Sequence, residues 1–278
     1  MRAHLRGIDH AVIAVRDLEA ARDTYARLGF TLTPRGRHTL GSQNHCIMFE
    51  RDYLELLALP KVHPSMRYYA DFLARGEGLA ALALAGDDAQ AAQAELLAAG
   101  IAAEAPLDFS RPVELPEGAR DASFRIVQLP AEQTPGCRAF VCQHFTPELV
   151  WRAEHQAHAV GAIAIAALAV VAEDPLVCAG RYGLVFGEAP RRIDEGWLVA
   201  SGSAPVALCT RSSLGHRLEG VGLPARTRPL VAALFVRVAD RGRARRALAR
   251  GGFGVVELRD GSLAVSAEQT HGVALVFG

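Results

Sequence analysis

The stretch GIDHAVIAVRD, residues 7–17, decides the fold, because its pattern returns three more times along the chain. An apolar run is followed by an aspartate, a helix-like segment and a glycine. The copies are IDHAVIAV (8–15) with Asp17 and Gly29, LAALALAG (79–86) with Asp88 and Gly100, IAIAALAVVAE (163–173) with Asp174 and Gly187, and VAALFVRV (231–238) with Asp240 and Gly252. Such regular spacing indicates an internal repeat of about one supersecondary unit.

Each position in the pattern has a physical role. An aspartate side chain accepts hydrogen bonds from the first free N–H groups of a helix. A glycine adopts the left-handed conformation that ends one. The runs before each aspartate are apolar, as in a buried strand. Strand-like pieces follow Gly29 (FTLTP, HCIMFE, YLELLAL) and Gly252 (GVVEL, SLAVS, VALVFG). The unit therefore reads strand-helix-strand-strand-strand, which argues against a Rossmann-type sheet.

The composition favours a small-molecule pocket over a nucleic-acid or membrane surface. The 278 residues carry 30 basic and 30 acidic side chains, and half are hydrophobic. The densest basic cluster, Arg241 to Arg250, falls on an expected helix and is interpreted as a solvated face. Five cysteines without a C-x-x-C pair indicate reduced thiols rather than a disulfide framework. We see no signal peptide or membrane-length apolar run, so a cytoplasmic protein is expected, and the alanine- and arginine-rich composition favours a bacterial source.

The pattern of repeats divides the chain into two halves. The segment TPELVWRAEHQAHA (146–159) interrupts the repeat between the second and third copies. We therefore expect one domain over residues 1–150 and a second over residues 158–278. Each domain would contain two of the repeated strand-helix-strand-strand-strand units and belong to the α+β class. A homodimer that forms through exposed sheet edges is a further expectation.

These residues resemble a known family. GIDHAVIAV, the capped helix, LGF and YLELLAL are similar to the vicinal oxygen chelate superfamily, and LGSQNHCIMF and CQHFTPELVW resemble its glyoxalase-like domain proteins. The resemblance implies tandem βαβββ modules of the glyoxalase/bleomycin-resistance/dihydroxybiphenyl dioxygenase type, four modules in two paired domains. It also implies a curved sheet around a cavity, with a divalent metal (zinc, iron, nickel, cobalt or manganese) that a substrate chelates through adjacent oxygens.

The resemblance places candidate metal ligands on the first and last strands of the modules. His10 lies on the first strand, and Glu55 lies among leucines in YLELLAL, where a carboxylate must be paired, protonated or metal-bound. The last strand of the second module offers Gln143 or His144, of which only one can face the cavity. We favour His144, because imidazole is the stronger ligand for these metals. The alternative for His10 is a core histidine satisfied by its neighbours.

The other modules lack these residues. Ala81, Ala167 and Ala233 stand where His10 stands, and Val276 lies near the place of Glu55 in the fourth module. We therefore expect no metal in residues 158–278. Because Ala81 replaces a possible ligand in the second module, a metal-free protein is an alternative.

Four further residues are candidate substrate contacts. Asn44 and His45 are neighbours on an expected strand, so they point to opposite faces, and either face could line the cavity. Arg111, in DFSRPVELPEG, and Arg125, in SFRIVQL, could each bind an anionic group, or could simply be solvated.

Two main functions follow from these observations. The first is a metal-dependent isomerase, lyase or dioxygenase acting on a small oxygenated metabolite, anionic if an arginine contacts it, with Glu55 as both ligand and proton shuttle. The second is a metal-free binding or sequestering protein that uses the same cavity. A scaffold that associates through its sheet edges is a third reading.

Overall fold

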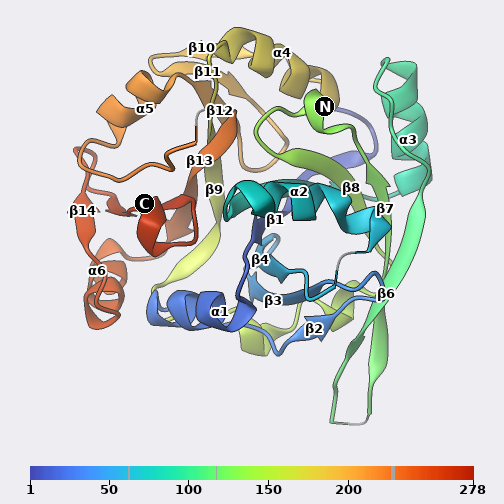
Figure 1. Ribbon diagram of the computed structural model, residues 1–278, viewed down its shortest axis with the longest axis horizontal. Helices are drawn as coiled ribbons and strands as arrows, with labels where there is room; N and C mark the ends of the chain where they lie inside the picture. The colour runs from blue at the N-terminus through green and yellow to red at the C-terminus, as the bar shows by residue number, and fades with distance from the viewer. Residues whose placement is uncertain (62, 117, 227–228) are drawn as a thin grey trace.

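The computed structural model describes residues 1–61, 63–116, 118–226 and 229–278, which form two curved eight-stranded sheets (Figure 1). The first sheet has the order β2-β3-β4-β1-β5-β8-β7-β6 and contains β1 (Leu5–Ala14), β2 (Gly36–Arg37), β3 (Gln43–Met48), β4 (Tyr53–Ala58), β5 (Gly78–Gly86), β6 (Leu107–Val113), β7 (Arg120–Gln128) and β8 (Arg138–His144). The second has the order β10-β11-β12-β9-β13-β16-β15-β14 and contains β9 (Ala162–Val171), β10 (Arg191–Ile193), β11 (Gly196–Val199), β12 (Val206–Cys209), β13 (Leu230–Val238), β14 (Val255–Glu257), β15 (Leu263–Val265) and β16 (Ala274–Phe277).

Each sheet consists of two βαβββ modules, so the α+β class and the four modules in two pairs are confirmed. The module helices are α1 (Leu18–Arg27), α3 (Ala89–Ala98), α4 (Pro175–Phe186) and α6 (Arg241–Arg250). Two further helices, α2 (Arg67–Arg75) and α5 (Arg211–Arg217), lie in the connections between modules. In each pair the two first strands run antiparallel, β1 beside β5 and β9 beside β13.

The aspartates and glycines of the repeat act as expected. The side chain of Asp17 accepts hydrogen bonds from the backbone N–H groups of Glu19 and Ala20, and the other three aspartates cap their helices in the same way. The four glycines have φ values of 94°, 78°, 70° and 75°, in the left-handed region where a Cβ is costly. The repeat therefore sets where each module helix begins and ends.

One expected strand is wrong. FTLTP, residues 30–34, makes only isolated contacts with β3, and β2 consists of Gly36 and Arg37 alone. Thr33 does donate its N–H to the carbonyl of Cys46, at 2.9 Å. The ladder stops there because Pro34, the next residue, has no N–H to donate.

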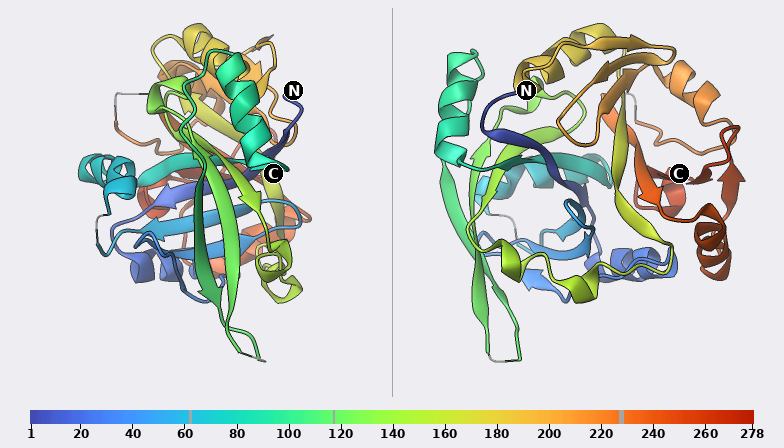
Figure 2. Two further views of the ribbon diagram at one scale, coloured as in Figure 1. Left: turned by 90° about the vertical axis from the view of Figure 1, so that its right-hand side faces the viewer. Right: turned by 180° about the vertical axis from the view of Figure 1, so that it is seen from behind.

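The two edges of the first sheet curve toward each other. The N–H of Thr39, in the loop after β2, donates to the carbonyl of Ser110 on β6, at 3.1 Å. Strands β6 and β7 form a long hairpin that extends past the rest of the sheet (Figure 2). The concave face of the first sheet is therefore almost closed into a barrel.

The two concave faces are filled differently. An apolar cluster that includes Leu214 and Leu218, from α5 and its end, packs onto the concave face of the second sheet. The concave face of the first sheet instead surrounds a cavity, which α2 borders through Tyr69. A separate, larger apolar core contains residues of both halves and ties them together.

Among the described residues, no helix has the length and apolar character needed to cross a membrane.

Candidate metal and substrate site

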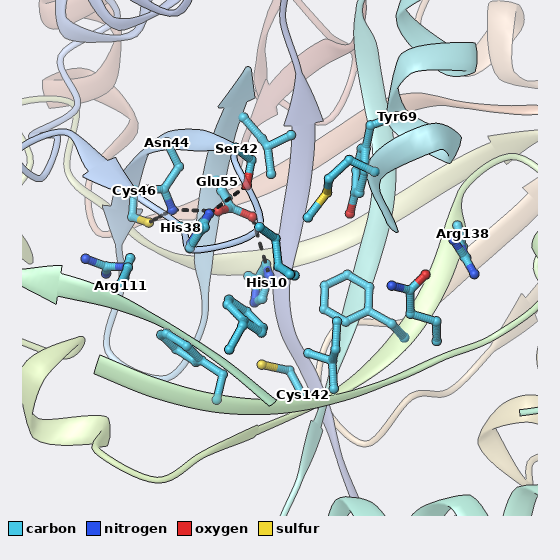
Figure 3. Close-up of a pocket in the computed structure, with 18 of the residues that line it drawn as sticks. His10, His38, Ser42, Asn44, Cys46, Glu55, Tyr69, Arg111, Arg138 and Cys142 are labelled. Carbon is cyan, nitrogen blue, oxygen red and sulfur yellow. Dashed lines mark hydrogen bonds and ion pairs between the residues drawn. The ribbon is translucent and has the colours of Figure 1, made fainter. Parts of the chain in front are cut away.

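A cavity in the first sheet contains most of the polar side chains that the sequence analysis singled out. It encloses about 740 Å³ of space free of atoms, part of it open to solvent. Its polar lining residues are His10, His38, Ser42, Asn44, Tyr53, Glu55, Tyr69, Arg111, Gln128 and Arg138, and its apolar lining includes Leu57, Phe109, Phe124, Ile126 and Phe140. Figure 3 shows His10 and Glu55 near the middle, with Arg111 and Arg138 at opposite ends.

His10 and Glu55 face each other at the base of the cavity. The Nε2 atom of His10 lies 3.7 Å from a carboxylate oxygen of Glu55, and the second carboxylate oxygen accepts a hydrogen bond from the amide of Asn44, at 2.6 Å. Glu55 is only 6% exposed. Among the described residues, its carboxylate contacts this imidazole and this amide but no arginine or lysine. The buried carboxylate is therefore held by an imidazole and an amide rather than by a guanidinium or ammonium group.

Asp9 orients His10 from behind. The β1–β5 pairing shifts register between Ile8 and His10, so Asp9 sits at an irregularity of the strand and reaches the same side as its neighbour. Its carboxylate lies 2.5 Å from Nδ1 of His10 and 3.2 Å from Nε2 of His144. Burial raises the pKa of Asp9, but the two histidines outweigh that effect and hold the pKa at about 2.

The ionised Asp9 decides which nitrogens carry protons. A carboxylate only accepts hydrogen bonds, so Nδ1 of His10 and Nε2 of His144 are the donors. The other ring nitrogen of His10, Nε2, faces Glu55 and is the atom that could bind a metal. A carboxylate behind a histidine in this way is typical of metal-binding histidines.

His144 lies on the cavity side of β8, whereas Gln143 lies on the other side. Gln143 accepts a hydrogen bond from the N–H of Ala89, so it supports the start of α3. Nδ1 of His144 and the indole Nε1 of Trp151 are both buried without a partner among the described residues, and the two rings are 4.8 Å apart.

A second group of possible metal ligands is formed by Asp9, Cys142 and His144, whose donor atoms lie within 4.8 Å of one another. In the structure, His144 lies at hydrogen-bonding distance from both Asp9 and Cys142, so the donor atoms of the group are engaged with each other. The nitrogen of His144 that faces the group carries a proton, and burial raises the pKa of the Cys142 thiol well above its ordinary value. Metal binding here would have to remove both protons.

His38 is a cavity residue that the sequence analysis did not find. It lies in the loop after β2, and its Nδ1 is 2.8 Å from the hydroxyl of Ser42. Burial lowers the pKa of His38 to about 4, although the nearby Glu55 acts in the opposite direction. Its imidazole is therefore neutral near pH 7. In the sequence, the one feature that could have indicated His38 is that it is a single histidine in a polar loop.

The strand alternation at positions 44 and 45 places Asn44 in the cavity and His45 outside it. Nδ1 of His45 lies 2.8 Å from the carbonyl of Thr33, on the face of the sheet that α1 covers. Asn44 has room because position 36 is glycine. A Cβ at Gly36 would lie 2.2 Å from Oδ1 of Asn44.

Of the two candidate arginines, one lies outside the cavity and the other lines it. Arg125 forms an exposed ion pair with Asp108, with nitrogen–oxygen distances of 2.6 and 2.8 Å, and does not line the cavity. Arg111 lines the cavity and is only 8% exposed. Arg138, which also lines it, is bound by Glu104 and by the carbonyl of Leu129.

The register of the parallel strand pairs locates the counterparts of Glu55 in the other modules. The equivalent pairs are Val12 with Glu55, Ala83 with Phe140, Ala169 with Ala207, and Phe235 with Val276. Phe140, Ala207 and Val276 therefore occupy its position, and none of them can bind a metal. The counterparts of His10 are the alanines at positions 81, 167 and 233. The first module alone has both donors.

Comparisons with known proteins identify the fold family. The family model described as glyoxalase-like domain matches residues 8–185. A comparison with curated protein sequences found no match. Among solved structures, the chain is similar to a hypothetical protein from Staphylococcus aureus (TM-score 0.69, 10% identity, covering 98% of each chain). It is also similar to a mutant 4-hydroxymandelate synthase from Streptomyces coelicolor (TM-score 0.65, 15% identity, 99% of this chain and 92% of that one). At these identities the similarity establishes the fold.

Proposed function

Because the chain belongs to the glyoxalase-like domain family, we propose that it is a metal-dependent enzyme of the vicinal oxygen chelate type, an isomerase or lyase that acts on a small oxygenated molecule. The observation that carries this proposal is the opposition of His10 Nε2 and the Glu55 carboxylate, 3.7 Å apart at the base of the cavity. Each of the two is held from behind, His10 by Asp9 and Glu55 by Asn44.

The donor chemistry fits a divalent cation. Two ligands about 2.0–2.2 Å from one ion lie roughly 3–4 Å apart, which is the spacing of this pair. A cation would also pair with the buried carboxylate of Glu55, which contacts no arginine or lysine among the described residues. His10 and Glu55 would hold it, and when bound it would polarise two adjacent oxygens of the substrate.

The side chains around the pair suit proton transfer next to those oxygens. One oxygen of Glu55 accepts from Asn44, so the other is oriented toward the cavity, where it can take a proton from a substrate carbon and return it. The neutral imidazole of His38 can donate or accept a hydrogen bond at a substrate oxygen. The aromatic walls exclude water and so strengthen both interactions.

An isomerase or lyase is favoured over a dioxygenase. Ferrous oxygenases hold iron with two histidines and one carboxylate on one face. The expected second histidine, His144, instead directs Nε2 at Asp9, at 3.2 Å. Of the two histidines on β1 and β8, His10 alone directs a nitrogen at Glu55.

The second candidate function is metal-free binding of a small molecule in the same cavity. The observation that favours it is the apolar pair Ala81 and Phe140 at the places that correspond to His10 and Glu55 in the second module. A protein of this kind would hold its ligand by the aromatic walls and the polar groups of the cavity alone.

Metal analysis separates the two candidates. Wild-type protein, purified without a histidine tag, loaded with divalent metals and then dialysed, is expected to retain about one equivalent per chain. If it retains none of zinc, iron, nickel, cobalt or manganese, metal-free binding becomes the better proposal.

A substitution at Gly36 tests the support of Glu55. In Gly36→Ala, the new methyl group displaces Asn44, which then releases the carboxylate of Glu55. Because groups behind a metal ligand contribute to affinity, we expect metal binding to weaken about 10- to 100-fold. Metal titration measures the effect. Gly180→Ala, on α4, is the control, since a Cβ there meets nothing within 4 Å and should leave affinity unchanged. Equal metal affinity in both variants would show that Asn44 does not support the metal ligand Glu55.

A further inference from the structure

Arg111 is a buried cation in the cavity that no described residue neutralises. It is 8% exposed, and no described side chain or carbonyl gives its guanidinium an ion pair or hydrogen bond. Other buried or half-buried arginines here are satisfied, as Arg138 is by Glu104. The nitrogens of its guanidinium are not among the fully enclosed atoms that lack a partner, so a ligand in the cavity can reach them and supply the negative charge.

The position of Arg111 makes it reachable from outside. It lines the main cavity and also a neighbouring cleft that contains Arg35, Arg37, Arg152 and His155. Arg35 is paired with Glu19 and Arg152 with Glu154, and the cleft is also lined by Glu114. Of the arginines in the cleft, Arg111 is the one that also lines the cavity.

The walls between Arg111 and the catalytic pair are apolar and aromatic. The rings of Phe109 and Phe124 are stacked with centroids 5.0 Å apart, and the ring of Phe109 meets that of His38 edge-on at 5.5 Å. Phe140 pairs with Gln128 at the other end of β7, and its ring lies edge-on to His10 at 5.5 Å, so it lines the part of the cavity away from Arg111. Such walls favour a flat or aliphatic body and offer it few hydrogen bonds.

We propose that the ligand of this cavity is a small organic acid with an apolar body, whose anionic head binds Arg111 while its body lies along Phe109 and Phe124 toward His10 and Glu55. The guanidinium binds a carboxylate through two parallel N–H groups. The assignment of the reacting end to His10 and Glu55 rests on the proposed function, whereas the binding of the anion at Arg111 does not.

Calorimetric titration with simple acids tests this. The probes are 3-phenylpropionate and hexanoate, their neutral amides, and phenyl phosphate as a second anionic head. We expect wild-type protein to bind the acids and Arg111→Met to bind them about 10- to 100-fold more weakly. The matched control is Arg125→Met, which removes an arginine from the outer surface of the same sheet and should bind as wild type. Tighter binding of phenyl phosphate than of the acids, lost in Arg111→Met, would support the anion site and assign it a phosphate head.

Three results would overturn the proposal: equal binding by Arg111→Met and wild type, equal binding of amides and acids, or no binding of any acid by the wild-type protein. Failure of the proposed function gives a different pattern. If wild type retains no metal but binds acids through Arg111, the proposed enzyme is wrong and the anion site stands. Glu55→Gln should keep acid binding, because it leaves Arg111 in place.

Discussion

His10→Ala and Glu55→Gln are each expected to abolish metal retention while the protein stays folded. Each change removes one of two donors that face each other at 3.7 Å, and the remaining donor cannot hold a divalent ion alone. Glutamine keeps the shape of the side chain but loses the charge and the ability to carry a proton. Turnover should therefore also fall, by about 10²- to 10⁴-fold for the loss of a general base. Elemental analysis and circular dichroism measure the two properties separately.

Two further variants make the test specific. Asp9→Asn should weaken metal binding by about 10- to 100-fold without abolishing it, since it only loosens the orientation of His10. His4→Ala removes a half-buried histidine, paired with Asp87 just before the same strand and outside the cavity, and should retain wild-type metal content. Full metal content in His10→Ala or Glu55→Gln would show that the metal site lies elsewhere.

Asp52→Asn is expected to stabilise the protein above neutral pH. Asp52 precedes β4, and its carboxylate accepts a hydrogen bond from the N–H of Ile165 in the second sheet, at 2.9 Å. Burial raises the pKa of Asp52 to about 7, although that hydrogen bond acts in the opposite direction. The folded protein thus prefers the protonated form. Its contribution to stability is full below the unfolded pKa, about 4, and is lost as the pH rises to about 7.

Asparagine removes the buried charge and still offers an oxygen to Ile165. We expect a gain of about 2–4 kcal/mol in the free energy of unfolding near pH 8, and little difference near pH 4. Denaturant unfolding across this pH range measures it. Asp23→Asn, at an exposed carboxylate on α1, should show no such pH-dependent gain. A stability difference between Asp52→Asn and wild type that does not change with pH would contradict the burial argument.

The modules could be predicted because their signals are local. An aspartate cap and a left-handed glycine act within one helix, so the sequence alone locates them. The positions of His10 and Glu55 on the first and last strands followed from the same repeat, helped by the family resemblance. The prediction of a strand at FTLTP was wrong because its β-branched and aromatic residues are typical of strands, whereas Pro34 has no N–H to continue the ladder.

The remainder of the site depends on strand register and loop closure, which local patterns do not contain. Alternation could say that Asn44 and His45 diverge, but only the pairing of β3 with β4 decides that Asn44 meets Glu55. The contribution of Asp9 depends on an irregularity in the β1–β5 ladder. His38 enters the cavity only because the edges of the sheet approach each other.

Anomalous X-ray scattering from crystals of the wild-type protein soaked with a divalent transition metal tests the central claim most directly. We expect one strong peak about 2.0–2.2 Å from both Nε2 of His10 and the carboxylate of Glu55. The peak should be absent from the same crystals of Glu55→Gln. A peak at Asp9, Cys142 and His144, or within residues 158–278, with none between His10 and Glu55, would contradict it.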